Sequence, residues 1–412
     1  MSKTGLYLVG ARGQVASTVA LGAVCLSRGL MGSTGLLTAT KPFQRLGLIS
    51  WHDLVLGGVD IRPTPLSTVA EAVCRTAGLM PLPEAVRESL ASVNEEIDSG
   101  TAVGCGRAVR DLAEGESLSD TLSLQETVCR IREKISVFRR RHDLSRVVVV
   151  NLASTEPPIH LNPAYAGLDG LEEALVNNDR DLVRASTLYT YAALQEQCAY
   201  INFTPSNAAL TPALVELAQK RGLPVMGNDG KTGETLVKSA LAPLFSIRNL
   251  RVLTWQGYNM LGNMDGRVLS HEENKESKRR SKDRGLSRIL GYQPHAPVGI
   301  DYVPSLGDQK TAWDFIHFEG FLGARMSVQV TWQGFDSILA APLVLDMARL
   351  ADLALRRGER GLMPHLACFF KDPQGVRVHG LVDQYRMLMD YATRVNAEKD
   401  PDRKVVSLAK EK

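Results

Sequence analysis

The sequence lacks the residue patterns of the commonest structural metal sites. Its six cysteines include no Cys-x-x-Cys pair, and its eight histidines form no His-Glu-x-x-His motif. The cysteines are Cys25, Cys74, Cys105, Cys129, Cys198 and Cys368. This scatter excludes the usual zinc spacings and favours a reducing compartment.

Long apolar runs are also missing. No stretch of about 18 apolar residues is available to span a bilayer. The apolar segment near the N-terminus is too short for a secretory signal and leads directly into a glycine turn. We therefore expect a cytoplasmic protein that does not contact a membrane.

An excess of charge of one sign is absent as well. The formal net charge is +3 at pH 7, which is too small to indicate nucleic-acid binding and leaves open a local basic site for an anionic substrate. Hydrophobic residues make up 44% of the chain and charged residues 23%, as is ordinary for a globular protein. The 412 residues exceed the usual ~100–200 residues per domain, so we expect two domains.

The first part of the chain alternates short apolar runs with segments of helical periodicity. Strands are predicted at 5–10, 47–51, 53–61, 146–151, 199–204 and 223–227. Helices are predicted at 14–29, 174–197 and 207–222, the last opening on Asn207 and closing on Gly222. Buried strands alternating with helices indicate a parallel sheet covered on both faces. Residues 66–141 are mostly helical and charged and are interpreted as an insertion between strands.

Beyond residue 245 the pattern changes to amphipathic strands. Residues 326–333 alternate strictly, with Met326, Val328, Val330 and Trp332 on one face, which predicts a half-buried strand of an antiparallel or mixed sheet. Segments 251–260 and 298–303 are its expected neighbours. Helical patterns return at 337–358 and 381–395, followed by a charged tail from about 397 to 412.

Gly10 to Ala16 form the first candidate binding turn. They follow the first predicted strand, open a helix, and partly match the G-x-G-x-x-G/A fingerprint of dinucleotide folds, with Arg12 in place of the middle glycine. A dinucleotide site and an ordinary strand–helix turn both stay open. Asp60, at the end of the second strand, is either the carboxylate for the adenosine ribose or a surface residue.

The loop GNDGKTGET at 227–235 resembles a phosphate loop of nucleotide hydrolases. The required motif has a glycine five places before Gly230, where this chain has Val225, and Gly227 is two places out of register. ATP binding is therefore disfavoured, and the loop needs another explanation.

The segment HEENKESKRRSKD at 271–283 places Lys275, Lys278 and Lys282 on one face of a predicted helix. It is either a solvated charged helix or an anion clamp that a bound phosphate or oxyanion would stabilise. Polar residues concentrate around it in otherwise apolar surroundings. They are Asn259, Asn263, Asp265, Asp308, Lys310 and Asp336. Each alone fits a turn, but their density indicates a site.

Taken together and in order, these segments resemble the myo-inositol-1-phosphate synthase family, from Gly5 to about Pro373. The matching segments are GARGQVAST, LGGVDI, NLASTE, STLY, AYINFTPSN, GNDGKTGET, YNMLGNMDG, ESKRRSKD, GDQK, FDSILAAPL and FFKDP. The resemblance implies that NAD-dependent oxidation at C5, enolisation, aldol closure and re-reduction convert D-glucose 6-phosphate to 1L-myo-inositol 1-phosphate. It places the 227–235 loop beside the nicotinamide and the substrate.

The resemblance also implies roles for individual residues. The catalytic set is Lys278, Lys282, Lys310, Lys371, Asp308, Asp336 and Asp265. The substrate-binding set is Asn259, Asn263, Lys231, Thr232 and Gly233. The cofactor-binding set is Gly10, Ala11, Arg12, Gly13, Gln14, Val15, Asp60, Ile61, Ala153, Ser154, Thr155, Asn228 and Asp229. The chain departs from the family pattern at Arg12, Val59, Phe203, Asn228 and Met264.

The implied fold is α/β: a Rossmann-type NAD-binding domain, residues 1–234 and 339–412, interrupted by an α+β catalytic and tetramerisation domain with a mixed sheet, residues 235–338. A homotetramer is expected. Asp60 favours NAD, although Arg62 next to it would suit the 2′-phosphate of NADP. A divalent metal or a monovalent cation as a further cofactor stays open. Two other functions stay open: a dehydrogenase or epimerase of a related sugar phosphate, and a non-catalytic nucleotide-binding homologue.

Overall fold

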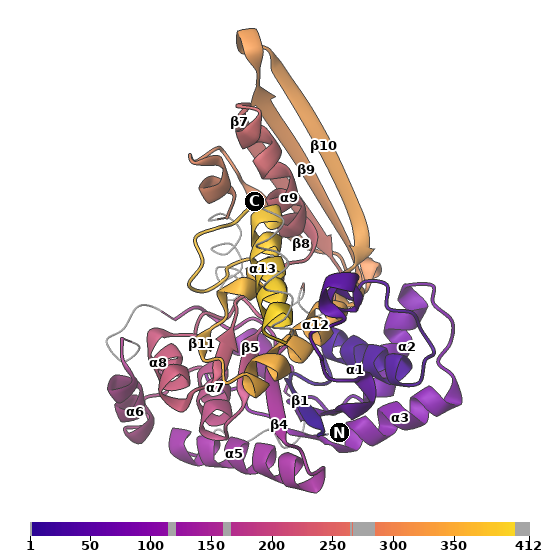
Figure 1. Ribbon diagram of the computed structural model, residues 1–412, viewed down its shortest axis with the longest axis vertical. Coiled ribbons are helices and arrows are strands. Elements are labelled where there is room, and N and C mark those ends of the chain that lie inside the picture. The colour runs from indigo at the N-terminus through magenta and orange to yellow at the C-terminus, as the bar shows by residue number, and fades with distance from the viewer. Residues whose placement is uncertain (1, 114–120, 160–165, 264–265, 267–284, 400–412) are drawn as a thin grey trace.

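The computed structural model describes residues 2–113, 121–159, 166–263, 266 and 285–399. Within them the strands form a parallel sheet and a separate mixed sheet (Figure 1). The parallel sheet has the order β11-β6-β5-β4-β1-β2-β3. Its strands are β1 (Thr4–Val9), β2 (Leu54–Asp60), β3 (Ile97–Ser99), β4 (Arg146–Asn151), β5 (Ala199–Asn202), β6 (Pro224–Met226) and β11 (Gly361–Leu362). This is the doubly wound order, which reverses direction between β1 and β4.

Helices cover both faces of the parallel sheet because its strands are apolar on both sides. Leu6 and Leu8 of β1 face one cluster and Tyr7 and Val9 face another. The first face is covered by α1 (Gln14–Ser27), α2 (Leu66–Thr76), α3 (Glu84–Glu95), α12 (Asp336–Arg356) and α13 (Leu381–Lys399). The second is covered by α4 (Arg107–Arg110), α5 (Leu124–Arg141), α6 (Leu168–Val176), α7 (Ala185–Gln195) and α8 (Pro212–Arg221).

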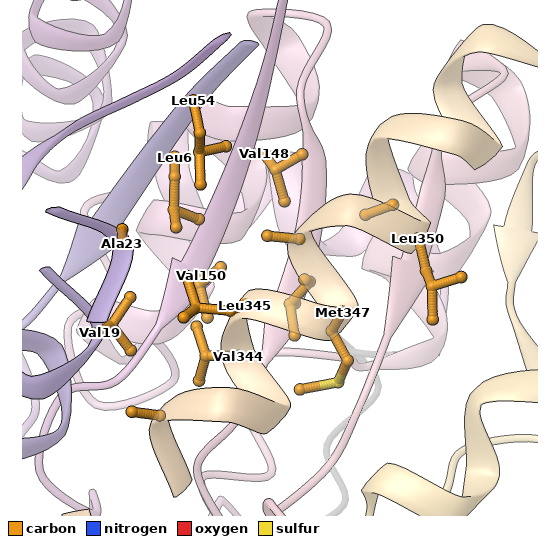
Figure 2. Packing of buried hydrophobic residues seen from close by; sticks show 14 of the residues in the cluster. Leu6, Val19, Ala23, Leu54, Val148, Val150, Val344, Leu345, Met347 and Leu350 are labelled. Carbon is orange, nitrogen blue, oxygen red and sulfur yellow. The ribbon is translucent and has the colours of Figure 1, made fainter. Parts of the chain in front are cut away.

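Helix α12, from the C-terminal part of the chain, packs against the first helix, α1. Val344 and Leu345 of α12 lie beside Val19 of α1, over Leu6 and Val150 of the sheet (Figure 2). Chain segments more than 300 residues apart thus share one core.

The second sheet has the order β10-β9-β7-β8, with strands β7 (Arg251–Leu261), β8 (Val298–Tyr302), β9 (Gln309–Glu319) and β10 (Arg325–Phe335). β7 and β8 are parallel and the other pairs are antiparallel, so the sheet is mixed. Helix α9 (Gly233–Ile247) packs on it through Phe245, which contacts Trp255 and Phe318. β9 and β10 form a long hairpin that projects away from the parallel sheet (Figure 1). The predicted fold class, α/β with a Rossmann-type parallel sheet and a separate mixed sheet, is confirmed.

Some predicted elements were wrong. Residues 47–51 are not a strand, because side chains bind the backbone carbonyls that a sheet would use: Arg356 binds Gly47 O and Arg349 binds Ile49 O. Residues 174–197 contain two helices, since Asn178 adopts a positive φ of 57° just after α6 ends.

Two further predictions needed partial correction. Thr211, not Asn207, caps α8, while Gly222 closes it in the left-handed conformation as predicted. Segment 66–141 is mostly helical but also supplies β3, which pairs with β2 in the main sheet. It is therefore not only an insertion between strands.

The predicted half-buried strand at 326–333 is β10, but its apolar face is exposed in the single chain. Met326 and Val328 are 43% and 39% exposed. They pair with Phe318 and Ile316 of β9, which α9 buries. β10 is the edge strand, and the helix does not cover it there.

Candidate functional site

The described residues enclose a cleft at the carboxyl ends of β1, β2, β4 and β5, where the sheet reverses its strand order. The space within it is about 1410 Å³, including the part open to solvent. Many predicted site residues line it. They are Gly10, Gly13, Gln14, Val15, Asp60, Ile61, Ala153, Ser154, Thr155, Asp229, Thr232, Asn263, Asp308, Asp336 and Lys371.

The glycine turn forms one end of this cleft. The N–H groups of Gly10 and Ala11 donate to Val59 O at 2.9 and 3.0 Å, which ties the turn to β2. A Cβ on Gly10 would lie 2.8 Å from Ala153 Cα, and φ at Gly10 is +80°, so a side chain here would collide with the 153–155 segment. Gly13 caps α1 without a side-chain hydrogen bond, and the helix start presents N–H donors to an anion.

Asp60 is buried and is not a surface residue. Its carboxylate accepts hydrogen bonds from the backbone N–H groups of Arg12 at 2.7 Å and Arg62 at 2.8 Å. The Arg12 guanidinium donates to Asn94, Arg62 O and Ile97 O. Arg12 therefore replaces the loop glycine with a side chain that braces the turn from behind, whereas Arg62 lines the cleft.

The residues after β4 form the opposite wall, together with a carboxylate that sequence reasoning missed. Glu156 lines the cleft and accepts hydrogen bonds from Ser186 N at 2.8 Å and Ser186 Oγ at 2.5 Å. Burial raises its pKa. Glu156 ends the NLASTE segment, so its place directly after a predicted strand was the available signal.

The 227–232 loop meets the segment around Lys371. Lys371 Nζ donates to Asp229 Oδ1 at 2.8 Å, and both side chains are at least nine-tenths buried. Backbone bonds run in both directions: Lys371 N donates to Asp229 O at 2.7 Å, and Lys231 N to Phe369 O at 2.8 Å. Two predicted residues from distant parts of the sequence are thereby held as an ion pair at the cleft.

A second lysine, Lys310 of β9, pairs with Asp336, a residue that lines the cleft. Lys310 Nζ is 3.5 Å from Asp336 Oδ1, and Thr232 Oγ1 donates to the same oxygen at 3.3 Å. A Cβ on Gly233, whose φ is +55°, would lie 3.3 Å from Lys310 Nζ. The structure thus brings the predicted Thr232, Gly233, Lys310 and Asp336 together.

Asp308 adjoins this group. Ser337 Oγ donates to its Oδ2 at 2.6 Å, and its Oδ1 has no hydrogen-bond partner within the described part of the chain. Burial raises the pKa of Asp308 to about 6; the Ser337 hydrogen bond opposes the shift and the charge of Asp336 adds to it. A carboxyl with this pKa can take up and release a proton near neutral pH.

Two predicted substrate residues have partners away from the cleft. Lys231 is buried and donates to Gln384 of α13, and burial lowers its pKa to about 8. Asn259 is fully buried on β7 and its Nδ2 donates to Glu234 Oε2 at 2.5 Å. Asn263 lines the cleft, where its Oδ1 accepts from Gly266 N at 3.0 Å.

The predicted residues Asp265, Lys278 and Lys282 lie outside the described residues, as does Met264. Within residues 2–113, 121–159, 166–263, 266 and 285–399, no group of three or more His, Cys, Asp or Glu side chains could hold a metal ion. Over the same ranges, no helix combines the length and the apolar character needed to cross a membrane.

A family model named for NAD binding and described as myo-inositol-1-phosphate synthase matches residues 4–393. The chain belongs to the myo-inositol-1-phosphate synthase family. It is 32% identical to inositol-3-phosphate synthase 1 of Bacteroides thetaiotaomicron, over 97% of each chain. The resemblance seen in the sequence motifs is confirmed.

Solved structures agree with this family assignment. Inositol-3-phosphate synthase of Caenorhabditis elegans superimposes with a TM-score of 0.85 at 27% identity, covering 96% of this chain and 86% of that one. A myo-inositol-1-phosphate synthase-related protein of Thermotoga maritima gives 0.78 at 27% identity, covering 95% and 98%.

Proposed function

We propose that the chain is an inositol-3-phosphate synthase that converts D-glucose 6-phosphate to 1L-myo-inositol 1-phosphate, with no net consumption of NAD. The observation that carries this proposal is that the Lys371–Asp229 ion pair lines the cleft that holds the glycine turn, together with Asp336, which pairs with Lys310. The relatives named inositol-3-phosphate synthase support it.

The residues present fit NAD as the cofactor. The turn at Gly10 leaves no room for a side chain beside Ala153, and α1 starts at this turn with N–H donors suited to a pyrophosphate. Asp60 has a buried carboxylate at the end of β2, where a ribose is bound in Rossmann folds. NAD bound at these residues would supply reversible hydride transfer at C5 of the substrate.

The side chains at the other end of the cleft suit the charges that this reaction creates. Enolisation and aldol closure place negative charge on oxygen atoms, and ammonium groups fixed in advance stabilise such charge. Lys310 and Lys371 are buried and each is held by one carboxylate. Asp308 moves a proton, since its pKa of about 6 lies close to neutral pH.

The substrate phosphate is assigned to the start of α9. This helix begins at Gly233, and the side chain of its N-cap, Thr232, makes no capping hydrogen bond. The free N–H groups of a first helical turn bind phosphate well. Lys278, Lys282 and Asp265 are proposed to complete the site, with Asn259, Asn263 and Lys231 positioning the loops around the substrate.

The proposal includes the domain plan and the assembly. Residues 235–338 are assigned to catalysis and tetramerisation, and 1–234 with 339–412 to NAD binding. The exposed apolar face of β10, with Met326 and Val328, supports assembly into a homotetramer. The free cysteines of the described chain suit a cytoplasmic location.

The test incubates the purified protein with glucose 6-phosphate and a catalytic amount of NAD. We expect a new inositol phosphate signal in phosphorus NMR and no accumulation of absorbance from NADH. Stoichiometric NADH would instead identify a dehydrogenase, and cofactor binding without turnover would identify a non-catalytic homologue. Titration with NADP belongs to the same experiment, because tighter binding of NADP than NAD would contradict the assignment of Asp60 to the ribose.

A further inference from the structure

Three asparagine side chains connect the carboxyl ends of neighbouring strands beneath the cleft. Asn151 ends β4 and Asn202 ends β5, and the two are paired in the strand register. Asn228 follows β6. All three are buried, being 2%, 0% and 5% exposed. Buried amides require partners for their donors and acceptors, so their hydrogen bonds constrain where the strands end.

The amides bind one another in sequence. Asn151 Nδ2 donates to Asn202 Oδ1 at 3.1 Å, and Asn202 Nδ2 donates to Asn228 Oδ1 at 2.7 Å. Asn202 is the central member: its Nδ2 also donates to Ser206 O at 3.0 Å, and its Oδ1 also accepts from Thr204 Oγ1 at 2.9 Å. We name Asn151, Asn202 and Asn228 the amide ladder.

Both ends of the amide ladder reach residues of the proposed active site. At one end, Asn151 Oδ1 accepts from Ala153 N at 3.2 Å, in the segment assigned to the cofactor. At the other end, Asn228 exchanges backbone hydrogen bonds with Asp372, at 2.8 and 3.1 Å. Asp229 and Lys371 are the chain neighbours of Asn228 and Asp372, and their side chains form the 2.8 Å ion pair.

We propose that the amide ladder positions the Asp229–Lys371 pair relative to the cofactor segment. This inference rests on the proposed function, in which Lys371 acts on the substrate. Asn202, Asn151 and Asn228 are positioning residues, since none of them supplies the reacting ammonium. Amides suit this task because each carries an acceptor oxygen and two N–H donors, so the central side chain can bind its neighbours on both sides.

The first test compares Asn202→Leu and Asn228→Ala with Asn207→Ala. The control residue, Asn207, lies on the loop that follows Asn202. It is exposed and makes two hydrogen bonds to the backbone of Ile159. A misplacement of about 1 Å can lower turnover ~10²-fold, so we expect kcat to fall ~10–100-fold in the two ladder variants. KM for glucose 6-phosphate should change less than ~3-fold, because the proposed phosphate site at α9 is untouched.

A conservative variant separates positioning from general damage to the fold. Asn228→Asp keeps an oxygen that accepts from Asn202 Nδ2, so it should recover kcat relative to Asn228→Ala. An equal loss of kcat in Asn228→Asp and Asn228→Ala would overturn the proposal. So would a kcat in Asn202→Leu and Asn228→Ala that equals the kcat of Asn207→Ala. If Asn202→Leu does not fold, the pair of Asn228 variants still decides it.

Hydrogen exchange tests the ladder independently of turnover. In Asn228→Ala the amide hydrogens of Lys371 and Asp372 should exchange at least ~10-fold faster than in the native protein, because their pairing with the 227–230 loop loosens. Unchanged exchange at both positions would contradict the positioning role. A native protein that forms no inositol phosphate would refute the proposed function while leaving this measurement valid.

Discussion

At the scale of single residues, Asp308 is proposed to act in catalysis, and its buried carboxyl group lowers the stability of the fold when it is ionised. Burial raises its pKa from 3.8 to about 6. The folded state therefore binds a proton more tightly than the unfolded state, and stability falls as pH rises from about 4 to about 6. Asp308→Asn removes this ionisation and should raise the free energy of unfolding at pH 7 by about 1–3 kcal/mol while lowering turnover.

The measurement for Asp308 is chemical unfolding of both proteins at pH 4 and pH 7. At pH 4 Asp308 is largely protonated in the folded native protein, so the gain from the substitution should nearly vanish. An equal gain at both pH values would show that its ionisation is not the cause.

Gly230 is expected to tolerate no side chain, because the Phe203 ring occupies that space. A Cβ on Gly230 would lie 2.0 Å from Phe203 Cζ. Gly230→Ala should destabilise the protein by about 1–3 kcal/mol, the usual cost of overpacking. A double-mutant cycle measured by urea unfolding tests this. The double variant Phe203→Ala/Gly230→Ala should lose less free energy of unfolding than the sum of the losses in the two single variants. Additive costs would argue against the clash.

Lys278 tests whether the charged segment 271–283 is a solvated helix or an anion clamp. If it is solvated, Lys278→Ala should change stability by only a few tenths of a kcal/mol and leave turnover intact. We expect instead that turnover falls ~10²–10³-fold, as for the loss of one preorganised donor. Lys282→Ala should also weaken substrate binding.

The control for Lys278 is Lys275→Ala, on the same predicted helix face. NAD titration should give native affinity for all three variants, since none of these lysines belongs to the glycine turn. Full turnover in Lys278→Ala would remove that residue from the site and leave the family assignment in place.

At the scale of elements, buried charge fixes α12 on the parallel sheet. Asp352 is 1% exposed and binds Thr4 of β1, Arg146 of β4 and Arg356 within the helix, at 2.7, 2.7 and 2.9 Å. Asp352→Leu leaves these groups without their acceptor, so it should lower the free energy of unfolding by about 3 kcal/mol.

The matched control for α12 is Asp383→Leu on α13. Asp383 pairs with Arg386 in solvent, and exposed pairs contribute about 0–1 kcal/mol. Thermal unfolding of both variants compares them directly. Similar small losses in both would mean that Asp352 does not hold α12 in place.

At the scale of the whole molecule, the long hairpin has apolar side chains that the single chain does not bury. Phe321 and Leu322 at its tip are each 88% exposed, beside Met326 and Val328 on β10. We expect a tetramer in light scattering for the native protein. Met326→Lys with Val328→Lys should yield smaller species that remain folded, because these positions contribute little to the core of one chain.

The hairpin prediction has a control on the same strand. Ser327→Lys introduces one lysine on the opposite face of β10, and it should leave the assembly unchanged. A native protein that is monomeric at all concentrations, or a tetramer that survives the double substitution, would contradict the proposed assembly surface.

Local periodicity and ordered motifs were enough to predict much of this protein. Runs such as 146–151 are short, apolar and rich in β-branched valine, which predicts buried strands, and the glycine turn follows directly after the first of these runs in the chain. The family was recognisable because many short motifs occur in a fixed order, and the fold class followed.

Only the tertiary structure decided which partner each polar group takes, because partners come from distant segments. Apolar segment 47–51 was predicted as a strand, yet α12 side chains bind its carbonyls. Asn259 binds Glu234, and Lys231 binds α13. Glu156 and the amide ladder were not found, since a hydrogen bond between strand ends has no periodic signature. Spacing along the chain determines which residues can share a face, and packing in three dimensions determines what they touch.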